Sequence, residues 1–157
     1  MKVPLTKPFF DHEELNLVKE VLDSGWVTQG PKVLEFEKSL AQFIQAKNII
    51  VVSNCTTALH LCMLISGVIP GDEVLVPSLT YIATANAIKY TGATPVFVDI
   101  ELDTYNIDPL DLETRITKKT KAIVAVHQIG LAANLGLLRK IAHKHHLILI
   151  EDAAPAL

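Results

Sequence analysis

Cysteine is scarce in this sequence of 157 residues, and its scarcity excludes a fold held together by disulfides. The two cysteines, Cys55 and Cys62, fall in a segment whose pattern indicates a helix. Seven helical residues place them about 10 Å apart, beyond the roughly 7 Å that a disulfide spans between Cα atoms. We therefore expect two reduced thiols, which are typical of the cytosol. A chain of this length buries about 70% of its unfolded surface, so it needs neither a disulfide nor a structural metal.

The sequence also lacks a run of eighteen apolar residues, an apolar export signal and any excess of positive charge. Its first residues carry Pro4 and Pro8 where an export signal would have an apolar stretch. The 14 Lys and Arg against 17 Asp and Glu give a formal net charge of −3, whereas nucleic-acid binding normally requires a concentrated positive field. We therefore expect no membrane span, no nucleic-acid partner and a cytoplasmic location.

What the sequence does contain is five short runs rich in valine and isoleucine, which are typical of strands covered on both faces. These runs are residues 49–52, 73–76, 95–98, 122–126 and 147–150. Helical patterns separate them, at residues 56–66, 82–90, 109–115 and 135–145. Asp108 and Pro109 suit the N-cap and the first position of the third of these helices. The alternation predicts an α/β fold with a mostly parallel sheet and flanking helices.

Two more amphipathic helices, at residues 11–22 and 31–43, precede the first predicted strand. The residues between them, 23–30, include two glycines, a tryptophan and two hydroxyl side chains, which indicates an ordered, functional loop. We therefore divide the chain into residues 1–48, with these helices and this loop, and residues 49–157, with the sheet. No helix follows the last predicted strand, so we expect the sheet domain to be incomplete at the C-terminus.

A candidate phosphate site follows the first predicted strand. Open parallel sheets bind ligands beyond the carboxyl ends of their strands, and here residues 53–57 read Ser-Asn-Cys-Thr-Thr before a helix. Hydroxyls and free backbone N–H groups at a helix N-terminus suit a phosphate. Simple capping of the helix by Ser53 or Asn54 is the alternative. The stretch has no glycine, so it is neither a Walker A loop nor a dinucleotide fingerprint.

Tyr81 and Asp152 follow two other predicted strands. Tyr81 suits stacking on a planar ligand, although a core or interface tyrosine is the commoner role. Asp152 is a carboxylate at the end of a buried strand, where it needs a cationic partner such as a protonated ring nitrogen, unless it caps a following helix. A phosphate, a flat ring and a basic ring nitrogen together describe pyridoxal 5′-phosphate, and a nucleotide fits them less well.

Histidine offers two further candidates. His143 and His146 share a helical face, but no carboxylate or cysteine is placed to complete a metal site with them. A solvated helix end is the favoured interpretation, and we expect no metal. His127 follows a predicted strand, where histidines usually satisfy local hydrogen bonds.

Several stretches of the sequence closely resemble the N-terminal part of the DegT/DnrJ/EryC1/StrS family of pyridoxal-phosphate-dependent sugar-nucleotide aminotransferases. They occur in the family's order and include Ser24-Gly-Trp-Val-Thr-Gln-Gly-Pro31, Cys55-Thr-Thr-Ala-Leu-His60, Pro70-Gly-Asp-Glu-Val-Leu-Val-Pro-Ser78, Thr84-Ala-Asn86, Gly92-Ala-Thr-Pro-Val-Phe-Val-Asp99 and Glu151-Asp-Ala-Ala154. The resemblance implies the large domain of fold type I of the pyridoxal-phosphate-dependent transferases. It also places the loop at 25–30 near the active site.

The resemblance implies a role for each candidate residue. Thr56 and Thr57, with the backbone of Cys55, match the phosphate-binding turn. Tyr81 matches the aromatic residue that stacks on the pyridine ring, and Asp152 matches the aspartate that keeps the ring nitrogen protonated.

Some positions depart from the family's pattern. Glycine is common in the family where Cys55 stands. Glutamine or histidine is common where Pro155 stands and contacts the cofactor there, a contact that proline cannot make. Leu131 and Ala132 replace the usual polar residue and proline.

The resemblance implies an enzyme that transfers an amino group from glutamate to a keto-sugar nucleotide in polysaccharide or deoxyamino-sugar biosynthesis, acting as a homodimer. The family's Schiff-base lysine falls beyond residue 157, so we expect the chain alone to be inactive. A sugar dehydratase of the same family and a non-catalytic truncated module are the alternatives. A nucleotide-binding regulator of flavodoxin type is disfavoured, because its glycine-rich or acidic sites are not evident.

Overall fold

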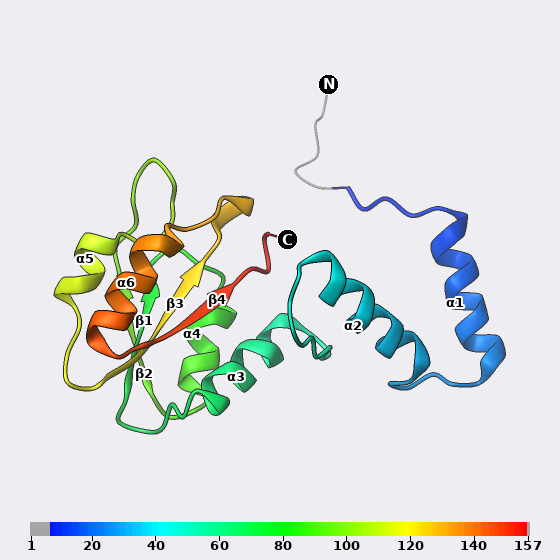
Figure 1. The fold of residues 1–157 in the computed structure, drawn as a ribbon, viewed down its shortest axis with the longest axis horizontal. Coiled ribbons are helices and arrows are strands. Elements are labelled where there is room, and N and C mark those ends of the chain that lie inside the picture. Colours follow the sequence, from blue (N-terminus) through cyan, green and yellow to red (C-terminus); the bar gives the residue numbers. More distant parts are fainter. Residues whose placement is uncertain (1–6, 157) are drawn as a thin grey trace. The chain divides into compact units, whose positions relative to one another are not determined.

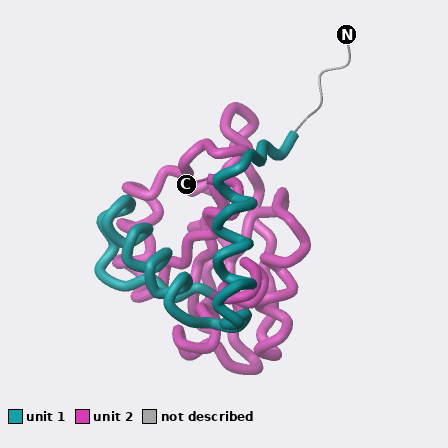
Figure 2. Tube along the Cα trace, turned by 90° about the vertical axis from the view of Figure 1, so that its right-hand side faces the viewer, with its two compact units in different colours: residues 1–51 teal, residues 52–157 magenta. Residues whose placement is uncertain are grey.

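The structure, a computed structural model, describes residues 7–156. The chain forms two compact units, which we call unit 1 (residues 1–51) and unit 2 (residues 52–157); Figure 2 colours them teal and magenta.

Unit 2 is built on a four-stranded sheet whose neighbouring strands are all parallel (Figure 1). The sheet has the order β2-β1-β3-β4. In chain order its strands are β1 (Glu73–Pro77), β2 (Thr94–Val98), β3 (Thr120–Val126) and β4 (Ile148–Asp152). The predicted α/β class with a parallel sheet and flanking helices is therefore confirmed. The two central strands are almost wholly buried, which explains their continuous apolar sequences.

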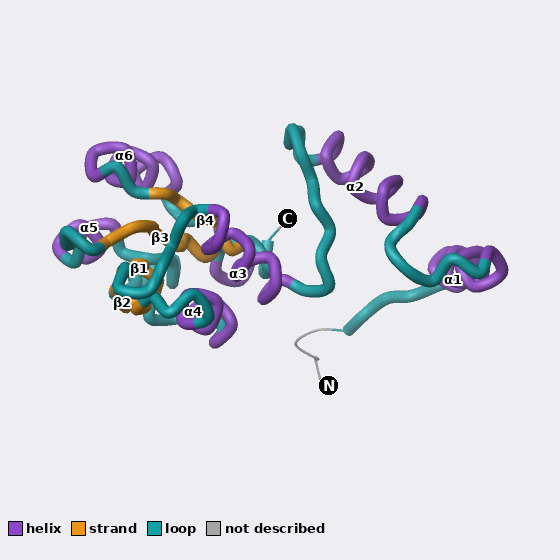
Figure 3. Tube along the Cα trace, turned by 90° about the horizontal axis from the view of Figure 1, so that it is seen from below, coloured by secondary structure: helices purple, strands orange, loops and turns teal. Residues whose placement is uncertain are grey.

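Helices cover both faces of this sheet, as Figure 3 shows in a view from below. On one face lie α3 (Cys55–Ile65) and α4 (Ile82–Lys89), and on the other lie α5 (Pro109–Thr114) and α6 (Leu135–His145). Side chains along β1 alternate between the two resulting cores. Val74 and Val76 pack in the core that includes Met63 of α3, whereas Leu75 packs in the core that includes Leu138 of α6.

The four helices of unit 2 lie where the sequence predicts them, because their ends carry local signals. The Asp108 side chain accepts a hydrogen bond from the Leu110 N–H, and Pro109 opens α5, so the predicted cap is confirmed. The α3 helix begins after Asn54 in the same way, with Asn54 as its N-cap.

The topology gives the sheet a switch point at its carboxyl edge, between β1 and β3. After β1 the chain enters α4 on one face, and after the neighbouring β3 it enters α6 on the other. Loops that leave adjacent strands toward opposite faces leave room for a ligand between them. The side chain of Gln128, after β3, donates a hydrogen bond across this point to the carbonyl of Leu79, after β1.

The predicted strand at 49–52 is wrong, because these residues form no ladder in the structure. A strand requires a hydrogen-bonded neighbour, and at Val51 side chains of unit 1 occupy both backbone groups instead. The Val51 N–H donates to Glu37 Oε1 at 2.9 Å, and the Val51 carbonyl accepts from Gln29 Nε2 at 3.2 Å. Apolar composition alone does not reveal this competition.

Unit 1 contains two helices, α1 (His12–Ser24) and α2 (Pro31–Phe43). Asp11 and Glu14 form a capping box at the start of α1. In the loop that follows, the Trp26 indole donates to the Gln29 carbonyl, and a Cβ on Gly30 would stand 2.1 Å from that indole. A larger residue at position 30 would displace the Trp26 indole, so the glycine allows the indole to pack against the loop.

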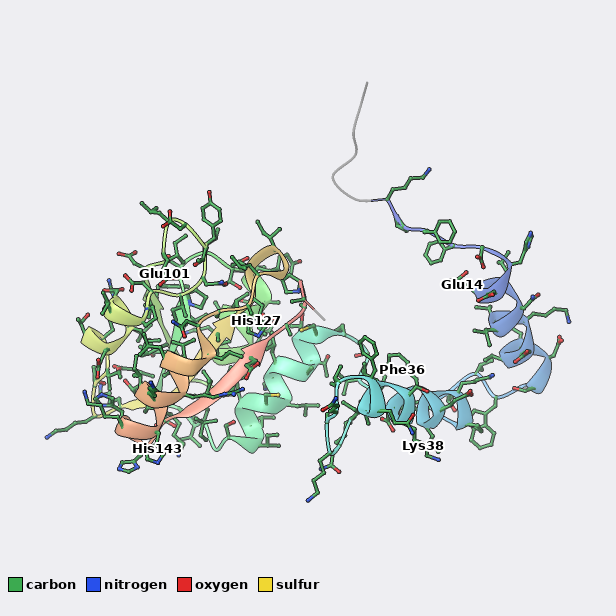
Figure 4. All side chains as sticks on the ribbon, turned by 45° about the horizontal axis from the view of Figure 1, so that its top comes forward. Glu14, Phe36, Lys38, Glu101, His127 and His143 are labelled. Atoms are coloured by element: carbon green, nitrogen blue, oxygen red, sulfur yellow. The ribbon has the colours of Figure 1, made fainter. Side chains whose placement is uncertain are left out.

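The apolar faces of α1 and α2 are exposed. Neither helix buries a residue, and Phe36, labelled in Figure 4, keeps 53% of its surface accessible. Among residues 7–156, no helix has both the length and the apolar character needed to cross a membrane.

Candidate functional site

Residues that lie far apart in the sequence meet at the carboxyl edge of the sheet in unit 2. The Cys55 sulfur, at the start of α3, lies 3.8 Å from Oδ1 of Asp152, at the end of β4. The Thr84 hydroxyl, in the first turn of α4, lies 2.8 Å from Oδ2 of the same aspartate. Asp152 is therefore the point at which two helix N-termini and one strand end converge.

Asp152 is a buried carboxylate, with 5% of its surface exposed. Three donors reach it, and all are neutral: the Thr84 hydroxyl, the Cys55 thiol and the Ala154 backbone N–H at 3.2 Å. Within the described part of the chain, no lysine, arginine or histidine forms an ion pair with it. A buried carboxylate without a cation is costly, so this position suits a positively charged ligand.

The N-terminus of α3 combines a cap with free donors. Asn54 Oδ1 accepts from the Thr57 N–H at 2.9 Å and from the Thr57 hydroxyl at 3.1 Å, so the capping interpretation is correct for Asn54. The cap satisfies only one of the first N–H groups of the helix. The N–H groups of Cys55 and Thr56 have no acceptor among residues 7–156, and they suit an anion.

Cys55 is exposed as a residue, and its sulfur points to Asp152. Partial burial of the sulfur, followed by the negative charge of Asp152, raises the pKa of the Cys55 thiol. The group therefore stays a protonated, weak donor at neutral pH. Cys62 is also a free thiol, as the sequence predicts.

Tyr81 immediately precedes α4 and has 77% of its surface exposed. That exposure excludes the core position, one of the two commoner roles that the sequence offers for this tyrosine. Its carbonyl accepts a hydrogen bond from the Thr84 N–H at 3.0 Å, so one helical turn carries both the exposed ring and the donor to Asp152.

His127 follows β3 and is buried, with both ring nitrogens in use (Figure 4). Nδ1 accepts from the Ala133 N–H at 3.1 Å, and Nε2 lies 3.3 Å from Glu151 Oε2. The tautomer with its proton on Nε2 satisfies both contacts. The structure therefore gives His127 the structural role that its sequence position favours.

The histidines at the end of α6 gather no metal site. His143 is exposed at that end (Figure 4), and His145 contacts Glu113 of α5 at 3.1 Å. Over residues 7–156, no three His, Cys, Asp or Glu side chains come together as metal ligands.

Thr84 and Thr80 are the residues of this site that sequence reasoning missed. Thr84 is 1% exposed, and its hydroxyl lies 2.8 Å from that of Thr80. Thr84 stands in a stretch that resembles the family, but nothing in that stretch indicates that its hydroxyl reaches a residue 68 positions away.

A parallel α/β unit with a buried acid, an exposed aromatic ring and free helix N–H groups at its carboxyl edge defines a class of cofactor-binding domains. The chain belongs to the DegT/DnrJ/EryC1/StrS aminotransferase family, whose model matches residues 8–157.

Two curated relatives resemble nearly the whole chain. It is 46% identical, over 98% of its length, to the spore coat polysaccharide biosynthesis protein SpsC of Bacillus subtilis, and it covers 40% of that protein. It is 44% identical, over 99% of its length, to the GDP-perosamine synthase of Caulobacter vibrioides, and it covers 42% of that protein. The chain thus spans about two fifths of the length of these relatives.

Among solved structures, the chain resembles a putative sugar aminotransferase from Streptococcus pneumoniae in its pyridoxamine-phosphate form (PMP-form). The TM-score is 0.95 at 34% identity, over 100% of this chain and 43% of the other. The pyridoxal-phosphate form (PLP-form) of the same protein gives the same TM-score.

Proposed function

We propose that this chain carries the cofactor-binding part of a pyridoxal-phosphate-dependent aminotransferase that acts on a keto-sugar nucleotide. The observation that carries the proposal is the surroundings of Asp152: a buried carboxylate held by neutral donors, with no cationic side chain paired to it within the described residues. A protonated pyridine nitrogen supplies a positive charge at such a position. The residues present therefore fit the cofactor.

The other candidate residues would hold the remaining parts of the cofactor. The N–H groups of Cys55 and Thr56 and the Thr56 hydroxyl would bind the phosphate at the start of α3. The Thr57 hydroxyl donates to Asn54, so it joins the phosphate only if its proton turns away from that side chain. Tyr81, exposed beside α4, would stack on the ring.

When bound, pyridoxal phosphate supplies an electron sink for the electron pair left on a substrate carbon that loses a proton. In this proposal Asp152 keeps a proton on the ring nitrogen, because its ionised carboxylate favours the charged form of that nitrogen. The N–H groups at the start of α3 would anchor the phosphate, and Tyr81 and Asp152 would hold the ring.

The substrate class rests on the relatives. One is named for spore coat polysaccharide biosynthesis and another for the synthesis of GDP-perosamine. We propose a keto-sugar nucleotide as the amino acceptor, glutamate as the donor, and a cytoplasmic homodimer as the working form. We also propose that residues 1–157 bind the cofactor without transamination, because the resemblance places the Schiff-base lysine outside them.

Pyridoxamine 5′-phosphate (PMP) is the appropriate binding probe, because it has no aldehyde and does not react with surface lysines. We expect the 157-residue chain to bind PMP in a calorimetric titration. Asp152→Asn should weaken binding about tenfold to a hundredfold, since a hydrogen bond involving a charged group contributes roughly 1.5–3 kcal/mol.

Asp103→Asn is the matched control. Asp103 is an exposed aspartate whose side chain forms no ion pair within the described residues, and its loss should leave PMP affinity unchanged. Equal affinity of the Asp152→Asn variant and the wild type would contradict the proposed role of Asp152.

A further inference from the structure

We propose that Thr84 is a positioning residue that fixes the orientation of the Asp152 carboxylate, and that Thr80 supports it from behind. The inference rests on the proposed function, in which Asp152 faces a ring nitrogen. Thr84 is almost fully buried, at 1% exposure, and its hydroxyl lies 2.8 Å from Oδ2 of Asp152. The resemblance to the family assigns no role to the hydroxyl of Thr84 or to that of Thr80.

The donors and acceptors available to Thr80, Thr84 and Asp152 fix the direction of the two hydrogen bonds that join them. An ionised carboxylate only accepts, so the single proton of the Thr84 hydroxyl points to Asp152. Thr84 Oγ1 is then an acceptor toward Thr80, whose hydroxyl, 2.8 Å away, must donate. Each bond in such a chain polarises the next, so Thr80 strengthens the donation from Thr84 to the carboxylate.

The Thr84 hydroxyl makes a long-range contact. Threonine hydroxyls often bond to nearby backbone groups instead. In α4 the Thr84 hydroxyl instead reaches a carboxylate 68 residues away. The same turn begins at Tyr81, so α4 holds the stacking ring and the Asp152 donor in a fixed relation.

The other two donors do not replace Thr84. The Cys55 thiol is 3.8 Å from Oδ1 and is a weak donor. The Ala154 N–H also contacts Oδ1, and it belongs to the same short segment as Asp152. Among these three donors, Thr84 is therefore the only one that holds Oδ2 and the only hydroxyl.

The test compares two probes on two variants. Thr84→Val keeps the shape of the side chain and removes the hydroxyl, whereas Thr84→Ser keeps the hydroxyl. The probes are PMP and its analogue in which a C–H group replaces the ring nitrogen, so that only PMP engages Asp152 through a charged nitrogen.

We expect Thr84→Val to weaken PMP about fivefold to tenfold and to leave the affinity of the analogue unchanged. Thr84→Ser should bind PMP within about twofold of the wild type. Thr91→Val is the matched control, because Thr91 is also buried but its hydroxyl donates only to the Ile88 carbonyl. It should change neither affinity.

Two results would overturn the inference: unchanged PMP affinity in Thr84→Val, or an equal loss for both probes, which indicates general damage to the pocket. Thr80→Val provides a second route should Thr84→Val not fold, since Thr80 is less buried. Thr80→Val should weaken the binding of PMP about twofold to threefold and leave the affinity of the analogue unchanged. Unchanged PMP affinity in Thr80→Val would overturn the support that Thr80 gives to Thr84.

Asp152→Asn separates this inference from the proposed function. If Asp152→Asn leaves PMP binding intact, the proposed function fails. If Asp152→Asn weakens PMP and Thr84→Val does not, only the role of Thr84 fails.

Discussion

Cys55 combines two roles at the residue scale, because its backbone and its side chain face different groups. Its N–H group has no acceptor among residues 7–156 and points out of the start of α3, while its sulfur approaches Oδ1 of Asp152. A glycine at this position, common in the family that the sequence resembles, would keep the first role and lose the second. The cysteine thus adds a weak donor to Asp152.

The raised pKa of the Cys55 thiol predicts how its reactivity depends on pH. Partial burial and then the Asp152 carboxylate disfavour the thiolate, which is the form that reacts with iodoacetamide. Removing the charge in Asp152→Asn should lower the pKa, so alkylation begins at a lower pH than in the wild type. The pKa should stay above the ordinary value, because burial, the larger cause, remains.

The measurement is the rate of Cys55 alkylation against pH, followed by mass spectrometry in a Cys62→Ala background. Glu151→Gln is the control, because that neighbouring carboxylate contacts His127 and Arg139 rather than Cys55. A profile that stays in place or moves to higher pH in Asp152→Asn would show that the carboxylate does not act on the thiol.

At the scale of elements, the proposed function gives the start of α3 two purposes. Asn54 caps the helix through the Thr57 N–H and thereby stabilises it. The cap leaves the N–H groups of Cys55 and Thr56 available, and the helix dipole favours a negative charge beside them. A neutral cap is therefore better suited to a phosphate site than a charged one.

Substitutions of Asn54 should separate stability from binding. Asn54→Ala should lower the free energy of unfolding by about 1 kcal/mol, because the cap is lost. Asn54→Asp should keep the stability, since aspartate caps equally well, but weaken PMP about fivefold or more through repulsion of the phosphate. Urea unfolding and calorimetry measure the two effects.

Pyridoxamine without its phosphate is the control ligand for Asn54→Asp. Its affinity should not fall, because the new charge repels only the phosphate. Full PMP affinity in Asn54→Asp would mean that the start of α3 does not hold the phosphate.

At the scale of the whole molecule, the two units differ in how their helices are stabilised. The helices of unit 2 cover a sheet with two apolar cores. In unit 1, α1 and α2 have 13 residues each and bury none of them. Helices of this length are marginal on their own in water, so the capping box and the side-chain contacts to Val51 contribute much of the order in unit 1.

Lysine side chains decide whether the 157-residue chain can hold pyridoxal phosphate covalently. Lys144 is paired with Glu113 at 2.6 Å, and no described lysine forms an ion pair with Asp152. We expect the chain to bind PMP yet to show no amino transfer from glutamate. Reduction with borohydride in the presence of pyridoxal phosphate should leave no single lysine labelled stoichiometrically.

Peptide mapping by mass spectrometry checks this expectation. Labelling spread at low level over surface lysines is the expected background, and Asp152→Asn should not change it. One fully labelled lysine, lost in Asp152→Asn, would overturn the expectation.

Part of the architecture followed directly from local patterns. Helices α3 to α6 and strands β1 to β4 lie within one or two residues of the predicted ranges, because caps, proline and apolar periodicity act over a few residues. The segment at 49–52 has the same composition as a strand. The backbone N–H and carbonyl of Val51 are nevertheless bound by Glu37 and Gln29, a competition that no local pattern reveals.

By itself, the sequence determined the parallel α/β class, the family and the candidate residues Cys55, Thr56, Thr57, Tyr81 and Asp152, because residue type and order carry that information. Only the tertiary structure decided which of them meet. Asp152 is reached by a thiol 97 residues away and a hydroxyl 68 residues away, and its burial leaves the carboxylate without a cation within the described residues. Such contacts depend on how strands and helices pack, and the spacing along the chain does not encode them.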